Sequence, residues 1–286
     1  MPKNIGVYCC VSHGTEKYAE FFRETCEQNR SNKYSISYKA VLSGDDAHTP
    51  DGFEFVDRVS RVDNPAYSHG LALQSCFHAI EEKYTVFADS DVAILYPNWD
   101  NESVENINYL YAAFGCQFPK KMLRYRDFPS IFYCMFDSEI LKKCNPDWMP
   151  KTNKKPKKNV VLEPITDKYW AEALAVPLNS IHQKDTFWSI REPFYRNGYK
   201  GKEIPMYYQF DKESIFSKQL NFNIYLKSQK LKVNHKVFKW FMHEFHWKNK
   251  IFATHLGGGR DSRRRGFNTK EAKLWFSCIK EYQNNQ

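Results

Sequence analysis

Apolar runs of strand length alternate with helix-length amphipathic segments through the first 145 residues of this 286-residue chain. Short apolar runs bounded by turn residues predict buried strands, and apolar residues at three- and four-residue spacing predict helices that cover them. A chain that alternates in this way is expected to be an α/β protein with a mainly parallel central sheet. The predicted strands are 5–11, 34–42, 53–59, 84–88, 109–114 and 131–136, and the predicted helices are 16–27, 67–81 and 138–143.

The rest of the chain carries weaker signals. The basic, proline-containing stretch 151–158 predicts a solvated connection between a first half, 1–145, and a second half, 159–286. A chain of 286 residues is short for two full domains, so both halves are expected to form one domain over the whole length. The last predicted helix, 269–282, begins after Thr269, whose hydroxyl suits a helix N-cap.

Charge, apolar runs and cysteine spacing limit the classes of partner and the cellular compartment expected for the chain. The net charge of +9, from 42 basic and 33 acidic residues, favours anionic partners such as nucleic acid, membrane surfaces or phosphorylated metabolites. The apolar run 5–11 is too short for the core of a signal peptide, and no apolar run has the roughly 18 residues that a membrane span needs, so neither is expected. The eight cysteines form no C-x-x-C pair, which predicts reduced, mostly buried thiols in a cytoplasmic protein.

The triplet Asp89-Ser90-Asp91 directly follows the apolar run 84–88 and precedes another, 92–95. In an extended strand, residues two apart point the same way, so both carboxylates are expected on one side of the strand's carboxyl end. Ligands of open α/β sheets bind beyond that end, and paired carboxylates suit a hard divalent cation. The alternative is a solvated turn, but two charges in so apolar a setting are costly unless they are paired or bind metal.

A second polar group follows a later apolar run, 251–255. His255 ends this run and offers an imidazole to a metal. Three glycines follow, and Gly258 is predicted to bring its backbone close to a diphosphate. Arg260, supported by the arginines at 263–265, is predicted to donate hydrogen bonds to the same group. The alternative is a structural histidine followed by a solvated basic loop.

With these motifs, Asp89-Ser90-Asp91 followed late in the chain by His255, the sequence resembles the GT-A class of glycosyltransferases. The resemblance covers about 5–145 by order of elements, and implies a nucleotide-binding α/β sandwich. It implies that Asp91 is the stronger ligand of a Mn²⁺ or Mg²⁺ ion and that His255 completes the metal shell. Asp89 would contact the ribose or reach the metal through water, and Ser90 would lie against the donor.

The resemblance also covers the segments around the nucleotide. The stretch 64–70 resembles the segment that opens the helix before the motif strand, which places His69 near the nucleotide. Val11 and Ser12, after the first strand, would contact the nucleoside. The class implies a nucleoside diphosphate sugar donor, with UDP-xylose, UDP-galactose and UDP-glucose as candidates, and an oligosaccharide or glycoprotein glycan as acceptor. The chain is also similar in character to cytosolic glycosyltransferases of large algal viruses, which implies a host-cell cytoplasm.

An inverting transferase needs a carboxylate that takes the proton from the acceptor hydroxyl. Asp185 is the predicted base, because it lies among aromatic residues that suit sugar stacking; the alternative for Asp185 is a helix N-cap. Asp211 and Asp137 are the further candidates, and Asp137 precedes a predicted helix, which favours a capping role. A retaining course needs a different arrangement, so the stereochemical course stays open.

Two other functions remain open at this stage. A metal-dependent nucleotidyl- or phosphotransferase would also use paired carboxylates and basic loops, although the P-loop pattern of many kinases is absent. A basic nucleic-acid-binding protein is disfavoured, because the positive charge is diffuse and no recognition motif occurs. A zinc site is not expected at His235, His243 and His246, whose spacing matches no usual zinc pattern.

Overall fold

A seven-stranded sheet is the centre of the fold. The computed structural model describes residues 4–62, 65–117, 128–152, 183–184, 190–208, 211–219, 242–256 and 269–286. The strand order is β10-β6-β7-β4-β1-β2-β3. Pairs β1–β2, β1–β4, β2–β3 and β6–β10 are parallel, while β7 runs antiparallel to β4 and β6. The predicted α/β class with a mainly parallel central sheet is therefore confirmed.

The main-sheet strands are β1 (Asn4–Ser12), β2 (Ser35–Ser43), β3 (Glu54–Val59), β4 (Tyr84–Asp89), β6 (Tyr111–Cys116), β7 (Tyr133–Asp137) and β10 (Lys200–Ile204). The helices are α1 (Glu16–Asn29), α2 (Pro65–His78), α3 (Trp99–Glu105), α4 (Ser138–Cys144), α6 (Arg191–Arg196), α7 (Ile215–Gln219) and α11 (Lys270–Asn284).

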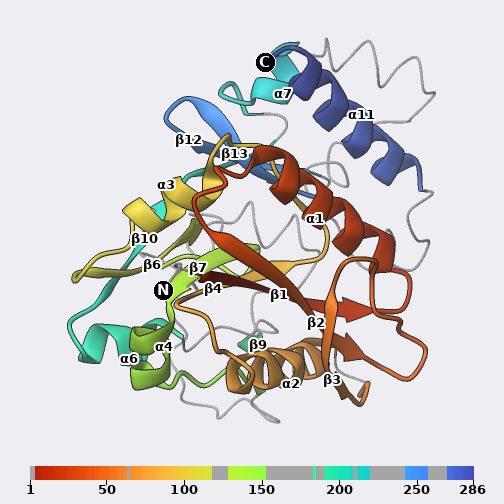
Figure 1. The fold of residues 1–286 in the computed structure, drawn as a ribbon. Helices are drawn as coiled ribbons and strands as arrows, with labels where there is room; N and C mark the ends of the chain where they lie inside the picture. The colour runs from red at the N-terminus through yellow and green to blue at the C-terminus, as the bar shows by residue number, and fades with distance from the viewer. Residues whose placement is uncertain are drawn as a thin grey trace, which may run out of the picture.

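Helices cover both faces of the main sheet (Figure 1). The apolar side of α1 packs with alternate residues of β1, represented by Ile5 and Val7. Helices α2, α4 and α6 pack on the opposite face, against Tyr8 and Phe87. Because both faces are buried, β1 and β4 are apolar almost throughout, as expected for strands inside a covered sheet.

The chain reverses its direction of travel through the sheet at β1. It moves from β1 to β2 and β3 on one side, with α1 as the first crossover, and then returns through α2 to place β4 on the other side of β1. Figure 1 shows α1 and α2 on opposite sides of the sheet, as this reversal requires. The carboxyl ends of β1 and β4 therefore flank a topological switch point, where open α/β sheets bind their ligands.

A second, four-stranded sheet packs on the α1 face. Its strands β5 (Val92–Ile94), β11 (Met206–Tyr208), β12 (His243–Trp247) and β13 (Lys250–His255) have the order β11-β12-β13-β5, and each neighbouring pair is antiparallel. Phe245, Phe252 and Ala253 extend the core between the two sheets. Helices α7 and α11 form a third apolar cluster with Ala93 and Leu95. A short pair, β8 (Lys151–Thr152) with β9 (Gln183–Lys184), completes the described strands.

Most predicted elements of the first half are present with small shifts of their ends. The strand predicted at 109–114 begins later, at Tyr111, because the side chain of Asn108 accepts hydrogen bonds from the backbone N–H groups of Leu110 and Tyr111 in a turn. The helix predicted at 67–81 begins and ends earlier, at Pro65 and His78. Thr269 caps α11 as predicted, by accepting a hydrogen bond from Ala272 N–H at 3.0 Å.

Two further sequence expectations concern cysteines and membranes. All eight cysteines lie in described residues as free thiols, and all but Cys10 are buried. Within the described ranges, none of the helices combines the length and the apolar character that crossing a bilayer requires. Most of the predicted connection at 151–158 lies outside the described residues.

A largely buried ion pair ties β2 to the segment between α2 and β4. Lys39 Nζ lies 2.7 Å from Glu82 Oε1, and the two side chains are 11% and 9% exposed. Ser37 Oγ donates to the same carboxylate at 2.8 Å, and Tyr8 Oη donates at 3.0 Å. Burial alone would raise the pKa of Glu82, but the hydrogen bonds from Lys39 and Ser37 outweigh it and leave that pKa below its ordinary value.

We expect Glu82→Gln to lower the free energy of unfolding at pH 7 by about 1.5–3 kcal/mol, the usual range for hydrogen bonds to a charged group. Because the folded-state pKa of Glu82 is lowered, its contribution is present above the ordinary Glu pKa of about 4.3 and is lost as pH falls through the folded value. Denaturant titrations from pH 7 to pH 3 should therefore show wild type and variant converging. The matched control is Glu81→Gln, an exposed neighbour, and an equal loss there would contradict the assignment.

Candidate metal centre

Asp89 and Asp91 lie where the chain passes from the main sheet to the second sheet. Asp89 is the last residue of β4, and β5 begins at Val92, so Ser90 and Asp91 form the turn between them. The sequence argument that alternation along a strand aligns the two carboxylates is therefore wrong in its geometry. They converge because the chain turns sharply to change sheets, and this turn brings the second carboxylate back beside the first.

His255 completes a cluster of three potential metal ligands. It pairs with Val92 across β13 and β5, and Leu256 N–H donates to Asp91 O at 2.9 Å, which fixes the end of β13 beside the turn. His255 Nε2 lies 3.2 Å from Asp91 Oδ1 and 3.9 Å from Asp89 Oδ2. One ligand atom from each of the three residues lies within 4.8 Å of the others. The structure thus brings together all three residues predicted to bind the metal.

The chemistry of this cluster fits a divalent cation. Asp91 and His255 are 5% and 3% exposed and the side chain of Asp89 is 16% exposed, so both carboxylates have limited contact with water. Like charges so close together are unfavourable unless a cation offsets them. His255 Nε2 is buried, points at the carboxylates and makes no hydrogen bond within the described part of the chain. Carboxylate oxygens with one imidazole suit Mn²⁺ or Mg²⁺, and Mn²⁺ accepts nitrogen more readily.

His69 joins the edge of the cluster. Its Nε2 atom, carried by α2, lies 3.7 Å from Asp89 Oδ1. Cys10, near the end of β1, has Cys76 and His69 as neighbours, and its pKa is raised chiefly by the Cys76 thiol and by burial. His69 therefore lies at the switch point beside Asp89, and its contact with a nucleotide stays a prediction.

Some of the other residues predicted to contact the donor lie in the described part of the chain, and the rest lie outside it. The side chain of Val11 is fully buried, so this residue can present only backbone atoms to a nucleoside. The Ser12 backbone N–H donates to Thr15 Oγ1 at 3.0 Å, and its carbonyl accepts from the same hydroxyl. Ser90 is buried in the turn. Gly258, Arg260 and the base candidate Asp185 lie outside the described residues, together with His235 and the arginines at 263–265.

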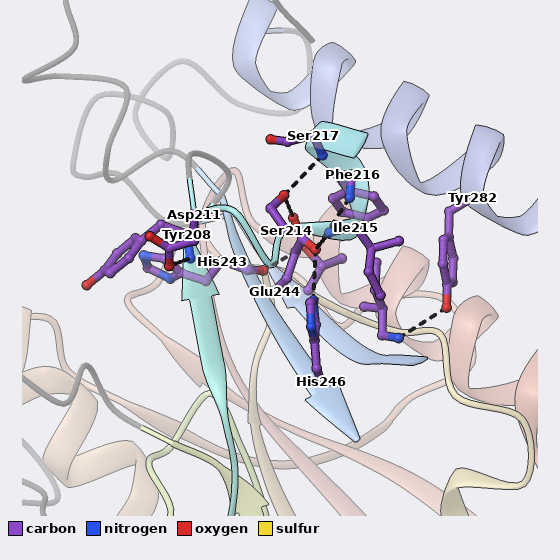
Figure 2. Close-up of polar contacts among 12 residues, drawn as sticks. Tyr208, Asp211, Ser214, Ile215, Phe216, Ser217, His243, Glu244, His246 and Tyr282 are labelled. Atoms are coloured by element: carbon purple, nitrogen blue, oxygen red, sulfur yellow. Dashed lines mark hydrogen bonds and ion pairs between the residues drawn. The ribbon is translucent and has the colours of Figure 1, made fainter. Parts of the chain in front are cut away.

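The two further base candidates both hold backbone turns. Asp137 Oδ1 accepts hydrogen bonds from Glu139 N–H and Ile140 N–H at 3.0 Å each, so it is the N-cap of α4, the role its position favoured. Asp211 Oδ2 accepts from Tyr208 N–H at 2.8 Å. Figure 2 shows Asp211 and Tyr208 beside His243.

His243 is the residue of this centre that the sequence argument missed. It is buried on β12, and its Nδ1 atom lies 3.0 Å from His255 Nδ1. Burial and the neighbouring His255 hold the pKa of His243 well below its usual range, against the opposing effect of Asp91. The ring also lies against Phe132 and Tyr208, with centroids 5.9 and 5.4 Å away.

A buried glutamate fixes the strand that carries His243. Glu244 is fully buried and accepts hydrogen bonds from Ile215 N–H at 2.8 Å and from the hydroxyl of Ser214, at the start of α7 (Figure 2). His246 Nε2 lies 2.9 Å from the same carboxylate. Because successive side chains alternate across a strand, His243 points to one face of β12 while Glu244 and His246 serve the other.

Comparisons with known proteins give partial structural similarity only. No protein-family model matches the sequence, and neither does any curated protein. Among solved structures, the chain is similar to the mannosyltransferase PcManGT from Pyrobaculum calidifontis, solved with GDP-Man and Mn²⁺, at 14% identity and a TM-score of 0.35, covering 50% of this chain and 46% of that chain. It is also similar to an active-site mutant of LgtC, at 11% identity and a TM-score of 0.32, covering 47% of this chain and 57% of that one. The chain thus covers about half the length of each, and these TM-scores identify no family.

We expect Asp91→Asn to weaken Mn²⁺ binding at least about 100-fold, because even residues that only support a metal ligand are worth 10- to 100-fold. Isothermal titration calorimetry with Mn²⁺ measures the loss, and the thermal midpoint shows that the variant is folded. Glu139→Gln, which neutralises an exposed carboxylate on α4, should bind Mn²⁺ like wild type. Equal affinities in Asp91→Asn and wild type would show that the cluster holds no metal.

Proposed function

We propose that the protein is a metal-dependent glycosyltransferase that moves a sugar from a nucleoside diphosphate donor to a hydroxyl group of a glycan. The observation that carries the proposal is the cluster of Asp89, Asp91 and His255 at the topological switch point of an α/β sheet. Phosphate-containing ligands bind at such points, and a cation there meets their negative charge. The resemblance of the Asp89-Ser90-Asp91 motif to that of the GT-A class supports the same reading.

One set of residues is proposed to bind the metal ion and the donor. Asp89, Asp91 and His255 would hold a Mn²⁺ or Mg²⁺ ion, and when bound that ion supplies Lewis-acid chemistry, since it offsets the charge that develops on the departing diphosphate. His69, Ser90 and the backbone at Val11 and Ser12 line the proposed nucleotide side. Gly258 and Arg260 complete the proposed diphosphate contacts.

The acceptor side needs a proton acceptor. In an inverting course, Asp185 takes the proton of the acceptor hydroxyl as its oxygen attacks the anomeric carbon, and the nucleoside diphosphate leaves from the opposite face. Asp211 is the second candidate, since it adjoins Tyr208, whose ring packs on His243. The proposed donor is a UDP-sugar, with xylose, galactose or glucose, and the proposed acceptor is an oligosaccharide or a glycoprotein glycan.

The proposed compartment is the cytoplasm. All eight cysteines are free thiols, which suits a reducing environment.

Metal-dependent stabilisation by a nucleoside diphosphate tests the function directly. With UDP and Mn²⁺ at about 100 times the dissociation constant, binding adds about 2.7 kcal/mol, which raises the midpoint of a chain of this size by several degrees. UDP without Mn²⁺ should give little shift, and GDP in parallel tests the choice of base. Stabilisation by DNA alone would overturn the proposal in favour of a nucleic-acid-binding protein.

Donor hydrolysis separates the transferase from a nucleotidyl- or phosphotransferase. Wild type with Mn²⁺ should release UDP from at least one of UDP-glucose, UDP-galactose and UDP-xylose. Asp91→Ala should lower that rate about 100-fold or more, as removal of one group that stabilises developing charge does elsewhere, while Glu139→Gln retains it. Full activity in Asp91→Ala, or release of UMP in place of UDP, would contradict the assigned chemistry.

A further inference from the structure

The contact between His243 and His255 constrains where the protons of the two rings lie. Two neutral imidazoles that meet through Nδ1 at 3.0 Å must share one proton, so one ring donates and the other accepts. For His255 to offer its Nε2 lone pair to a cation, its proton must be on Nδ1. In that state the only hydrogen-bond acceptor that Nδ1 contacts among the described residues is Nδ1 of His243.

We propose that His243 is a positioning residue, which accepts the His255 Nδ1–H hydrogen bond and so holds His255 in the tautomer that binds the metal through Nε2. This inference rests on the proposed metal site and adds a residue to it. Metal-bound histidines generally donate their other ring nitrogen to a fixed acceptor, which sets the ring orientation and makes the ligand more basic. Here the acceptor is a second, neutral imidazole instead of a carboxylate or carbonyl.

The surroundings of His243 leave it little freedom to turn. Its ring lies nearly parallel to that of His255, at 25° and 5.3 Å, and edge-on to Tyr208. Phe132 packs against both imidazoles and is closer to His255, at 4.3 Å. A neutral imidazole has one protonated and one unprotonated ring nitrogen, so Nδ1 of His243 accepts the hydrogen bond when the ring's proton is on Nε2.

The backbone of His243 is also fixed from the C-terminal helix. Thr254 Oγ1 donates to the His243 carbonyl at 2.9 Å and accepts from Trp275 Nε1 at 3.1 Å. Trp275, Thr254 and His243 therefore form a hydrogen-bonded chain that runs from α11 to the His243 backbone carbonyl. The C-terminal helix is in this way connected to the strand that carries His243.

The hairpin register decides whether the two histidines meet. Next to the turn, Trp247 pairs with Lys250 and His246 with Ile251, and this register continued would set His243 opposite Thr254. A bulge adds one residue to β13, so that His243 pairs with His255. The bulge also turns the His255 side chain to the face that holds Asp89 and Asp91.

Paired variants test the role of the acceptor nitrogen. His243→Phe keeps a ring of similar size but has no acceptor, and we expect its Mn²⁺ dissociation constant to rise 10- to 100-fold. His243→Asn places an amide oxygen near the position of Nδ1 and should recover most of the affinity. The matched control is His246→Phe, which removes an imidazole from the opposite face of the same strand and should bind Mn²⁺ like wild type.

Two readouts separate positioning from stability. Calorimetry with Mn²⁺ gives the affinity, and the visible absorption of bound Co²⁺ reports the ligand set, which should lose its imidazole character in His243→Phe. Thermal midpoints identify any variant that fails to fold, in which case His243→Asn against wild type carries the test. Wild-type affinity in folded His243→Phe, or equal weakening in His243→Asn and His243→Phe, would overturn the inference.

Mn²⁺ binding by Asp91→Asn distinguishes failure of the proposed metal site from failure of the proposed role of His243. If Asp91→Asn loses Mn²⁺ binding and His243→Phe does not, the metal site stands and the role of His243 is refuted. If wild type binds no Mn²⁺ at all, both the proposed function and this inference fail.

Discussion

Two carboxylates held close together at the junction of two sheets are the constraint around which this end of the molecule is organised. Asp89 ends a strand of the main sheet, and Asp91 lies in the turn that enters the second sheet. The charge of this pair is unfavourable in so enclosed a place without a compensating cation. His255 ends β13, a strand from late in the chain that pairs with β5, so the site depends on the pairing of these two strands in the second sheet.

The sequence predicts the main sheet well because its signals are local. Apolar runs such as 84–88 and the alternation of strand and helix are visible within a few residues, and the position of an aspartate after a buried strand is as well. The second sheet was not predicted. Strands β5 and β11 have three residues each, too few for a periodic pattern, and β5 pairs with a strand from far along the chain. Long-range pairing of this kind leaves no mark on the local sequence.

The sequence predicts the candidate site for reasons that the structure bears out only in part. Its two aspartates were recognised by their place after a strand, although a turn, and not strand alternation, brings them together. His255 was recognised by its place before the glycines. The sequence argument excludes His243 because metal-binding motifs are defined by spacing along the chain. A hairpin, by contrast, brings residues together across strands. In the structure the turn of this hairpin has φ of 48° at Lys248 and 63° at Asn249, typical of a two-residue loop. Lys-Asn is not one of the glycine-containing pairs that mark such a loop in a sequence, so the pairing of the two histidines has no clear local signal.

Because of the bulge in β13, the site depends on whether the number of residues between the hairpin turn and His255 is odd or even. Side chains alternate across a strand, so adding or removing one residue between the turn and His255 would carry its imidazole to the face of α11, while the hydrophobic hairpin could still pair. Adding or removing two residues would keep the His255 side chain on the same face of β13 and change only its distance from Asp89 and Asp91. The fold therefore tolerates any small change in the length of this hairpin, whereas the site tolerates only changes of an even number of residues. A relative with one residue fewer here would keep the architecture but lack the metal centre.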